Sequence, residues 1–163
     1  MFFLRRIFNK NSEKETMDFC YKHGFKSGKK FQYNSGYPID ANWPWLISVG
    51  DNVTLATGVK LLAHDASTVK IEGIGTKSGI VEIGNNVFIG ANSVVCDDIP
   101  SNSVYAGNPA KYICSFDEFS KKHRDNQESH TVFREYEWDK WIDSSEEEKE
   151  NMYNKLKKTH GYL

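Results

Sequence analysis

The middle of the chain repeats with a period of six residues, and this repeat restricts the fold more than any other feature. One block runs from Val49 to Leu61, and a second runs from Ile83 to Pro100. An aliphatic residue opens each six, Gly or Ala usually takes the second place, and a small or apolar residue takes the fifth. Helices need a period near 3.6, and Gly, Asn and β-branched residues are poor helix formers. The repeat therefore predicts short strands joined by turns.

The six-residue spacing also predicts how these strands are arranged. One six cannot bury its own apolar residues, so successive turns of the chain must stack on one another. In a parallel β-helix the opening aliphatic residues point inward, and Gly and Asn take the tight corners, where a positive φ costs them least. A sandwich of Val- and Ile-rich strands is the alternative, and the phase kept across two separate blocks argues against it. We therefore expect a mainly β protein built on a short parallel β-helix.

Differences in composition along the chain predict its organisation. We expect three parts: an N-terminal arm or helix over 1–24, the β-helix over 25–114, and a C-terminal helical extension over 115–163. The stretch 65–79 breaks the six-residue period and is rich in Gly, which predicts a loop that leaves the coil. Two Ser-x-x-Glu sequences, which begin at Ser115 and Ser145, are typical of helix N-termini.

The two ends of the chain carry apolar residues that we expect to be packed. The first ten residues are apolar and basic but lack the long apolar stretch and cleavage site of a signal peptide. We interpret them as a short helix or arm that packs on the protein's own fold. Aromatic and aliphatic residues over 132–142 form one apolar side of the tail. We expect them to pack on the β-helix or on a neighbouring subunit.

Charge and composition exclude several classes of protein. The 21 basic and 22 acidic residues leave a net charge of −1, and no basic stripe indicates a nucleic-acid partner. No apolar run approaches the roughly 20 residues of a transmembrane segment. The three cysteines, Cys20, Cys96 and Cys114, fit neither a zinc pattern nor a disulfide framework. We therefore expect a protein of a reducing compartment, the cytoplasm.

Several segments resemble the hexapeptide-repeat acyltransferases, over about residues 25–115. They are Leu46–Asp65, Val81–Ala91, Asp98–Pro100 and Ala106–Lys111. Within that family the chain is most similar to the O-acetyltransferases of sugars and surface polysaccharides, such as maltose and galactoside acetyltransferases. The resemblance implies a left-handed β-helix, acetyl-CoA as acyl donor, no metal, and a homotrimer with active sites between neighbouring subunits. It also implies a sugar hydroxyl as acceptor, in capsule or lipopolysaccharide biosynthesis.

The resemblance gives His64 the role of catalytic base. His64 is the one histidine of the repeat zone, and an imidazole suits this role because its ordinary pKa is near 6.5. Asp40 lies roughly one coil earlier and would orient His64 or hold a sugar hydroxyl, with the capping of a turn as an equally open alternative. Phe88 takes the place of a Trp that lines the acyl site in many relatives, and a plain core role is its alternative.

Four more residues are expected to bind coenzyme A. Gly90 and Ala91 are small enough for the pantetheine arm to lie against the coil, where backbone amides can donate hydrogen bonds. Ala106 and Lys111 belong to the segment near which the adenosine end lies in relatives. Lys111 would be a cation for a coenzyme A phosphate, with a solvated surface lysine as the alternative.

Two departures from the family pattern weaken the expected donor binding. Relatives carry one more coil between Ser93 and Asp98, and Asp97 stands where they often have a lysine near the donor's phosphates. A degenerate, non-catalytic β-helix that acts as a binding or assembly scaffold is therefore the alternative function. A γ-type carbonic anhydrase shares the coil architecture, but it needs three histidines on zinc and the repeat zone supplies one.

Overall fold

The computed structural model describes residues 10–34, 36–132, 144–157 and 161–162. The chain divides into two units, Met1–Asp117 and Glu118–Leu163. Strands dominate the first unit and helices the second. The boundaries at 24 and 114 that composition predicts remain predictions.

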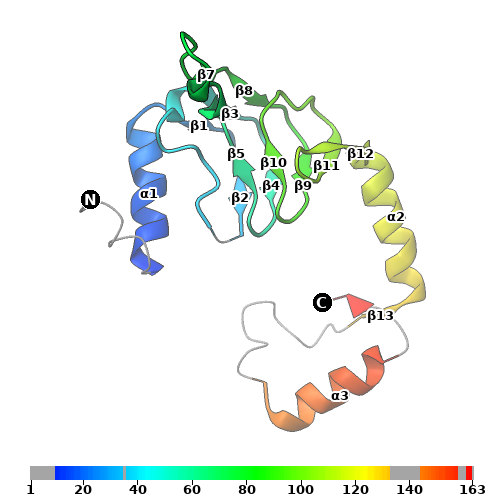
Figure 1. Cartoon of the computed structure of the whole chain (residues 1–163). Coiled ribbons are helices and arrows are strands. Elements are labelled where there is room, and N and C mark those ends of the chain that lie inside the picture. Colours follow the sequence, from blue (N-terminus) through cyan, green and yellow to red (C-terminus); the bar gives the residue numbers. More distant parts are fainter. Residues whose placement is uncertain (1–9, 35, 133–143, 158–160, 163) are drawn as a thin grey trace. The chain divides into compact units, whose positions relative to one another are not determined.

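Parallel strands of the first unit form three sheets. One sheet contains β1 (Lys26–Ser27), β3 (Ile47–Val49) and β8 (Val81–Ile83). The second contains β2 (Gln32–Tyr33), β4 (Val53–Leu55), β9 (Val87–Ile89) and β11 (Ser103–Ala106). The third contains β5 (Lys60–Leu61) and β10 (Val94–Val95). Strands that are neighbours within one sheet are separated along the sequence by strands of the other sheets. The chain therefore winds in coils with three sides (Figure 1).

Aliphatic side chains of the repeat fill the inside of the coil. Both the opening and the fifth places of the sixes are buried, namely Val49, Val53, Leu55, Val59, Leu61, Ile83, Val87, Ile89, Ser93, Val95 and Ile99. The prediction that the opening residues point inward is confirmed, and the fifth places are buried as well. Burial of each Val, Leu or Ile side chain contributes about 1.5–3 kcal/mol, so this interior column is the main source of stability.

The corners of the coil follow the predicted chemistry in part. Asn52, Asn86 and Asn92 have positive φ, as we expected of the corner asparagines. Gly58, at the same place of its six as these asparagines, also has a positive φ, so the corner prediction is confirmed there, whereas the glycines at the second places do not have that conformation. A Cβ atom on Gly50 would lie 2.7 Å from the carbonyl oxygen of Gly84 in the next coil. Glycine is needed at this place because neighbouring coils approach closely there.

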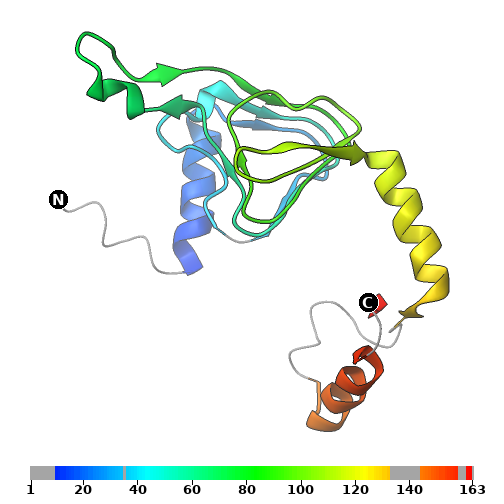
Figure 2. The same ribbon diagram turned by 45° about the vertical axis from the view of Figure 1, so that its right-hand side comes forward.

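Helix α1 (Lys10–Lys22) covers one side of the first coils, as Figures 1 and 2 show. It contributes two buried side chains, Met17 and Cys20, to the core. The expected packing of the first nine residues lies outside the described residues. Farther along, β12 (Lys111–Ser115) pairs antiparallel with β11 and ends the second sheet.

The stretch that breaks the repeat leaves the coil as a projecting arm (Figure 2). Its base is an antiparallel pair of β6 (His64–Asp65) and β7 (Lys77–Ser78), and it contains the short helix η3 (Ser67–Lys70). The hydroxyl of Thr68 donates to the carbonyl oxygen of Gly75 at 2.6 Å. The arm therefore has internal hydrogen bonds, and its base begins at His64.

The second unit contains most of α2 (Phe116–Ser129), then β13 (Thr131–Val132), α3 (Glu146–Leu156) and β14 (Gly161–Tyr162). The helix start predicted at Ser145 is confirmed: its hydroxyl accepts from the backbone N–H of Glu148 at 3.2 Å, and the Glu148 carboxylate accepts from the Ser145 N–H at 2.7 Å. Helix α2 begins directly after Ser115. The predicted apolar side at 132–142 lies almost wholly outside the described residues. Among the described helices, none has the length and apolarity needed to cross a membrane.

Candidate active site

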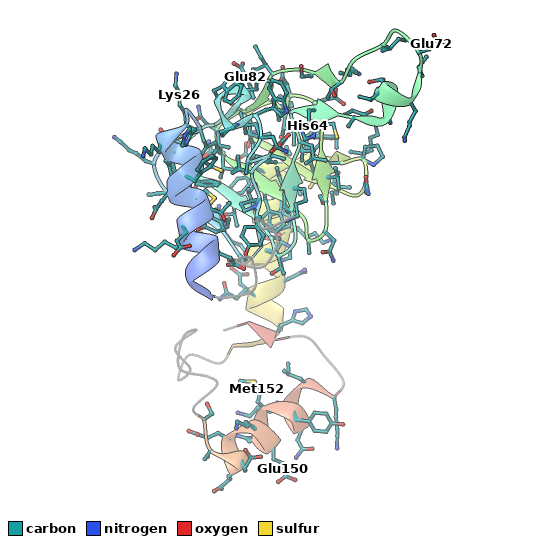
Figure 3. All side chains as sticks on the ribbon, turned by 60° about the vertical axis from the view of Figure 1, so that its left-hand side comes forward. Lys26, His64, Glu72, Glu82, Glu150 and Met152 are labelled. Carbon is teal, nitrogen blue, oxygen red and sulfur yellow. The ribbon has the colours of Figure 1, made fainter. Side chains whose placement is uncertain are left out.

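Three chain segments meet at the corner between the third and the first sheet. Parallel pairing aligns Ile39 with Leu61, and Leu61 with Val95, in three successive coils. The segments that follow these residues are 40–43, 62–64 and 96–97. They therefore lie one above another along the coil axis, with His64 in the middle. Figure 3 shows His64 at the base of the arm whose tip carries Glu72.

His64 is held by the carboxylate of Asp40. The Nδ1 atom of the imidazole hydrogen-bonds to Oδ2 of Asp40, whose side chain is 3 % exposed, whereas the His64 side chain is 25 % exposed. A carboxylate accepts hydrogen bonds, so Nδ1 must carry the proton and donate it. The Nε2 atom then has a free lone pair. This arrangement is the tautomer that a general base needs.

The remaining hydrogen bonds of Asp40 help to distinguish its three predicted roles, which are to orient His64, to hold a sugar hydroxyl or to cap a turn. Its Oδ1 accepts from the backbone N–H of Asn42 at 3.1 Å, which is the capping of a turn. Its Oδ2 also accepts from the N–H of Ala63 at 3.3 Å. Both oxygens are thus engaged with protein groups, and the buried side chain has almost no surface for a sugar hydroxyl. The geometry favours the orienting role.

A cavity of about 380 Å³ opens beside His64. Its wall combines the corner of the coil with the base of the arm, and it includes Leu62, Lys77, Ile80, Cys96 and Asp97. The sequence pointed to Asp97 but to neither Lys77 nor Ile80. The break in the six-residue period was the only signal for them, because it marks where the arm leaves and re-enters the coil.

The ionisable groups around the cavity differ in their protonation at neutral pH, and His64 is the candidate base. Burial raises the pKa of the Cys96 thiol, and the neighbouring carboxylates Asp97 and Asp65 raise it further. Hydrogen bonds from Ser67 lower the pKa of Asp65, and the positive charge of Lys77 lowers it further. At neutral pH the thiol is therefore protonated and a poor nucleophile, and Asp65 is ionised.

The residues expected to bind coenzyme A lie together at a different corner. Gly90 follows β9, and a Cβ atom on it would lie 3.0 Å from the Cβ atom of Ala106. Lys111 pairs with Ala106 across β12 and β11, and Ala91 is exposed beside Gly90. This corner joins the second sheet to the third, whereas His64 lies where the third sheet leads back to the first. Within one subunit the structure thus brings these four residues together but not with His64.

Phe88 lies on the outer face of the second sheet. Its neighbours in β9, Val87 and Ile89, are buried inside the coil, so its side chain points the other way and is half-buried. The cavity beside His64 does not include it. A core role for Phe88 does not fit this position, and its role at an acyl site stays a prediction.

No family model matches the chain. CapG of Staphylococcus aureus is 36 % identical over 133 residues, which cover 68 % of this chain and 76 % of CapG. The chain belongs to the hexapeptide-repeat acyltransferase family. Its class of chemistry is therefore acyl transfer, and acetyl-CoA, the predicted donor, is a donor of this family.

Two further comparisons cover less of the relatives' length. WbbJ of Escherichia coli (strain K12), named as an O-acetyl transferase of lipopolysaccharide biosynthesis, is 54 % identical over 39 residues, which are 24 % of this chain and 20 % of WbbJ. A solved maltose O-acetyltransferase from Clostridium difficile 630 is 30 % identical with a TM-score of 0.43, over 58 % of this chain and 60 % of that one.

In the described part of the chain, no group of three or more His, Cys, Asp or Glu side chains is arranged to hold a metal ion.

Proposed function

We propose that this protein transfers an acetyl group from acetyl-CoA to a sugar hydroxyl in the biosynthesis of a surface polysaccharide. One observation carries the proposal: a buried Asp40 fixes the tautomer of a partly exposed His64 at the edge of a cavity. The sugar acceptor is supported by the name of WbbJ, which matches this chain over a short segment.

The proposed step uses His64 as base and then as acid. Nε2 takes the proton of the sugar hydroxyl while the hydroxyl oxygen attacks the thioester carbon. Backbone N–H groups would stabilise the resulting oxyanion. The C–S bond then breaks, and the sulfur of coenzyme A leaves with the proton held on Nε2. Asp40 stabilises the imidazolium that forms in between, as the carboxylate of a catalytic triad does.

We further propose that the coil is a left-handed parallel β-helix that works in the cytoplasm as a homotrimer. The assembly would explain why the coenzyme A residues and His64 occupy different corners of one coil. A donor bound against Gly90 and Ala106 of one subunit would meet His64 if neighbouring subunits pack corner to corner. Phe88, on the outer face of the second sheet, would then line the acyl site from the neighbouring subunit. Light scattering at micromolar concentration is expected to give the mass of three chains, and a stable monomer would contradict the shared site.

The scaffold remains the second candidate, because of one specific observation. Asp97 lines the cavity beside His64, where a carboxylate repels a phosphate. Lys77 lines the same cavity, and at position 97 a site adapted to bind coenzyme A would favour a second cation over a carboxylate.

Thioester turnover separates the two candidates. The purified full chain is incubated with acetyl-CoA and a panel of methyl pyranosides and disaccharides. Released thiol is measured with a chromogenic disulfide, and acetylated sugar is measured by mass spectrometry. The proposal expects thiol and acetyl sugar in equal amounts. A folded protein that forms neither product with any sugar would support the scaffold.

A further inference from the structure

Two tryptophans lie at the corner that carries His64, one coil earlier. Trp43 and Trp45 flank the start of the short helix η2 (Pro44–Leu46). Their ring centroids are 5.5 Å apart, and the centroid of Trp43 lies 6.4 Å from that of His64. Trp45 is 56 % exposed, and Trp43 is partly buried against the core. An aromatic surface therefore extends outward from the candidate base.

The backbone under this surface is fixed. Pro44 is buried, the N–H of Trp43 donates to the carbonyl oxygen of Asp40 at 3.2 Å, and the N–H of Leu46 donates to that of Trp43 at 3.0 Å. Gly24 supports Trp45 from the other side: it has a φ of +102°, and a Cβ atom on it would lie 2.9 Å from the Cβ atom of Trp45. The backbone and the Cβ atom of Trp45 are thus held in place, while more than half of the residue is exposed to water.

An exposed tryptophan on a fixed backbone, in contact with the tryptophan that neighbours the base, suits a sugar ring. A large aromatic side chain normally stabilises a protein by burying 150–250 Å² of surface. Much of the Trp45 side chain stays exposed to water unless a ligand covers it. A pyranose has one face of C–H groups that can lie on an aromatic ring, and a rim of hydroxyls that stays polar. A hydroxyl of a sugar stacked there would have to come within about 2.6–3.2 Å of Nε2 for proton transfer.

The order of the segments along the coil axis indicates on which side of His64 the acceptor binds. The tryptophans precede His64 by one coil, whereas Cys96 and Asp97 follow it by one coil. The residues expected to bind the donor come from the later coils. The acceptor therefore binds on the side of the earlier coil, where the tryptophans lie.

We propose that Trp43 and Trp45 form the acceptor subsite of the acetyl transfer, and this inference rests on the proposed function. Trp43 takes the pyranose that receives the acetyl group, and Trp45 takes the sugar linked to it. The two rings are tilted by 55°, so they present two faces rather than one flat surface. Such a pair fits two linked pyranoses and predicts a preference for a disaccharide or longer glycan over a single sugar.

Trp45→Ala tests the subsite, because the exposed side chain can be removed with little loss of core packing. Maltose, cellobiose and lactose are compared with the methyl glycosides of glucose and galactose as acceptors. We expect the KM for the preferred disaccharide to rise about three- to tenfold, with kcat and the Kd for acetyl-CoA little changed. Trp45→Phe should restore most of the affinity. Tyr153→Ala, at an exposed aromatic residue of α3, is the matched control and should change none of these values.

Titration of the intrinsic fluorescence with the same disaccharides gives a readout that does not depend on turnover. The wild type should show a saturable change, and Trp45→Ala should show a smaller change with a Kd about three- to tenfold higher, because Trp43 still reports the bound sugar. An unchanged disaccharide KM in Trp45→Ala overturns the subsite, and so does the absence of a fluorescence change in the wild type. A lower oligomeric mass for Trp45→Ala also overturns it, because Trp45 then belongs to a subunit interface. Sugar binding without any turnover would instead overturn the proposed function and leave the subsite supported.

Discussion

Replacement of Asp40 by asparagine keeps the shape of the side chain and changes only its hydrogen-bonding capacity. The carboxylate accepts three hydrogen bonds: from the N–H groups of Asn42 and Ala63, and from His64 Nδ1. An asparagine has one acceptor oxygen and one donor NH₂ group. In either orientation of the amide, at least one of the three donors therefore faces another donor.

The two orientations have different consequences for His64. If the amide oxygen faces Asn42, the NH₂ group faces His64 and forces the proton from Nδ1 to Nε2, which abolishes the base. If the oxygen faces His64, the tautomer survives, but the imidazolium loses its carboxylate and the N–H of Asn42 loses its acceptor. In the first orientation the NH₂ group also faces the N–H of Ala63, which is buried, and a buried donor without a partner costs about 1–3 kcal/mol. In a chain of this size that loss lowers Tm by roughly 2–12 °C.

We therefore expect kcat of Asp40→Asn to fall by about 10²–10⁴. Thiol release in the coupled assay gives kcat, and circular dichroism during heating gives Tm. Asp51→Asn is the matched control, because its carboxylate also accepts a backbone N–H, that of Lys29 at 2.6 Å, at a different corner. Its kcat should stay at the wild-type value. A wild-type kcat in folded Asp40→Asn would refute the orienting role and the tautomer argument with it.

The other predictions concern the binding of acetyl-CoA and the reactivity of the Cys96 thiol. Asp97→Lys should tighten acetyl-CoA binding and Lys111→Ala should loosen it, because each substitution changes the charge that faces the phosphates. Calorimetric titration measures the Kd of each variant. The same titration at rising salt concentration should show weaker binding to the wild type. If neither substitution alters the Kd, the phosphates lie elsewhere. Cys96 should react with iodoacetamide more slowly than a free thiol at pH 7 because its pKa is raised, and faster in Asp97→Asn. Acetyl-CoA should protect Cys96, which lines the cavity, and mass mapping that finds equal labelling with and without acetyl-CoA would exclude the donor from the cavity.

The strands were predictable because the six-residue period is a local property. Each opening aliphatic residue, such as Leu55 or Ile89, needs only its own six to be assigned to the inside. The role of Gly50 was not predictable in the same way. Its need for glycine comes from the carbonyl of Gly84, which lies 34 positions later in the chain.

The candidate site was predictable where a residue's role follows from the coil and the family likeness. His64 was found by its place at the end of a repeat block, and Asp40 by its position one coil earlier. Their hydrogen bond depends on the pairing of Ile39 with Leu61, which fixes which side chains meet at the corner. Trp43 and Trp45 were not singled out, because the conformation of the segment before β3 follows no periodic rule.

The measurement that tests the account most directly is the turnover of His64→Ala with acetyl-CoA and the best acceptor of the sugar panel. We expect kcat to fall by about 10²–10⁴, with the circular dichroism spectrum and the oligomeric mass of the wild type retained. His123→Ala, in α2, serves as the control and should keep full turnover. Wild-type kcat in a folded His64→Ala protein would contradict the assignment of His64 as the base.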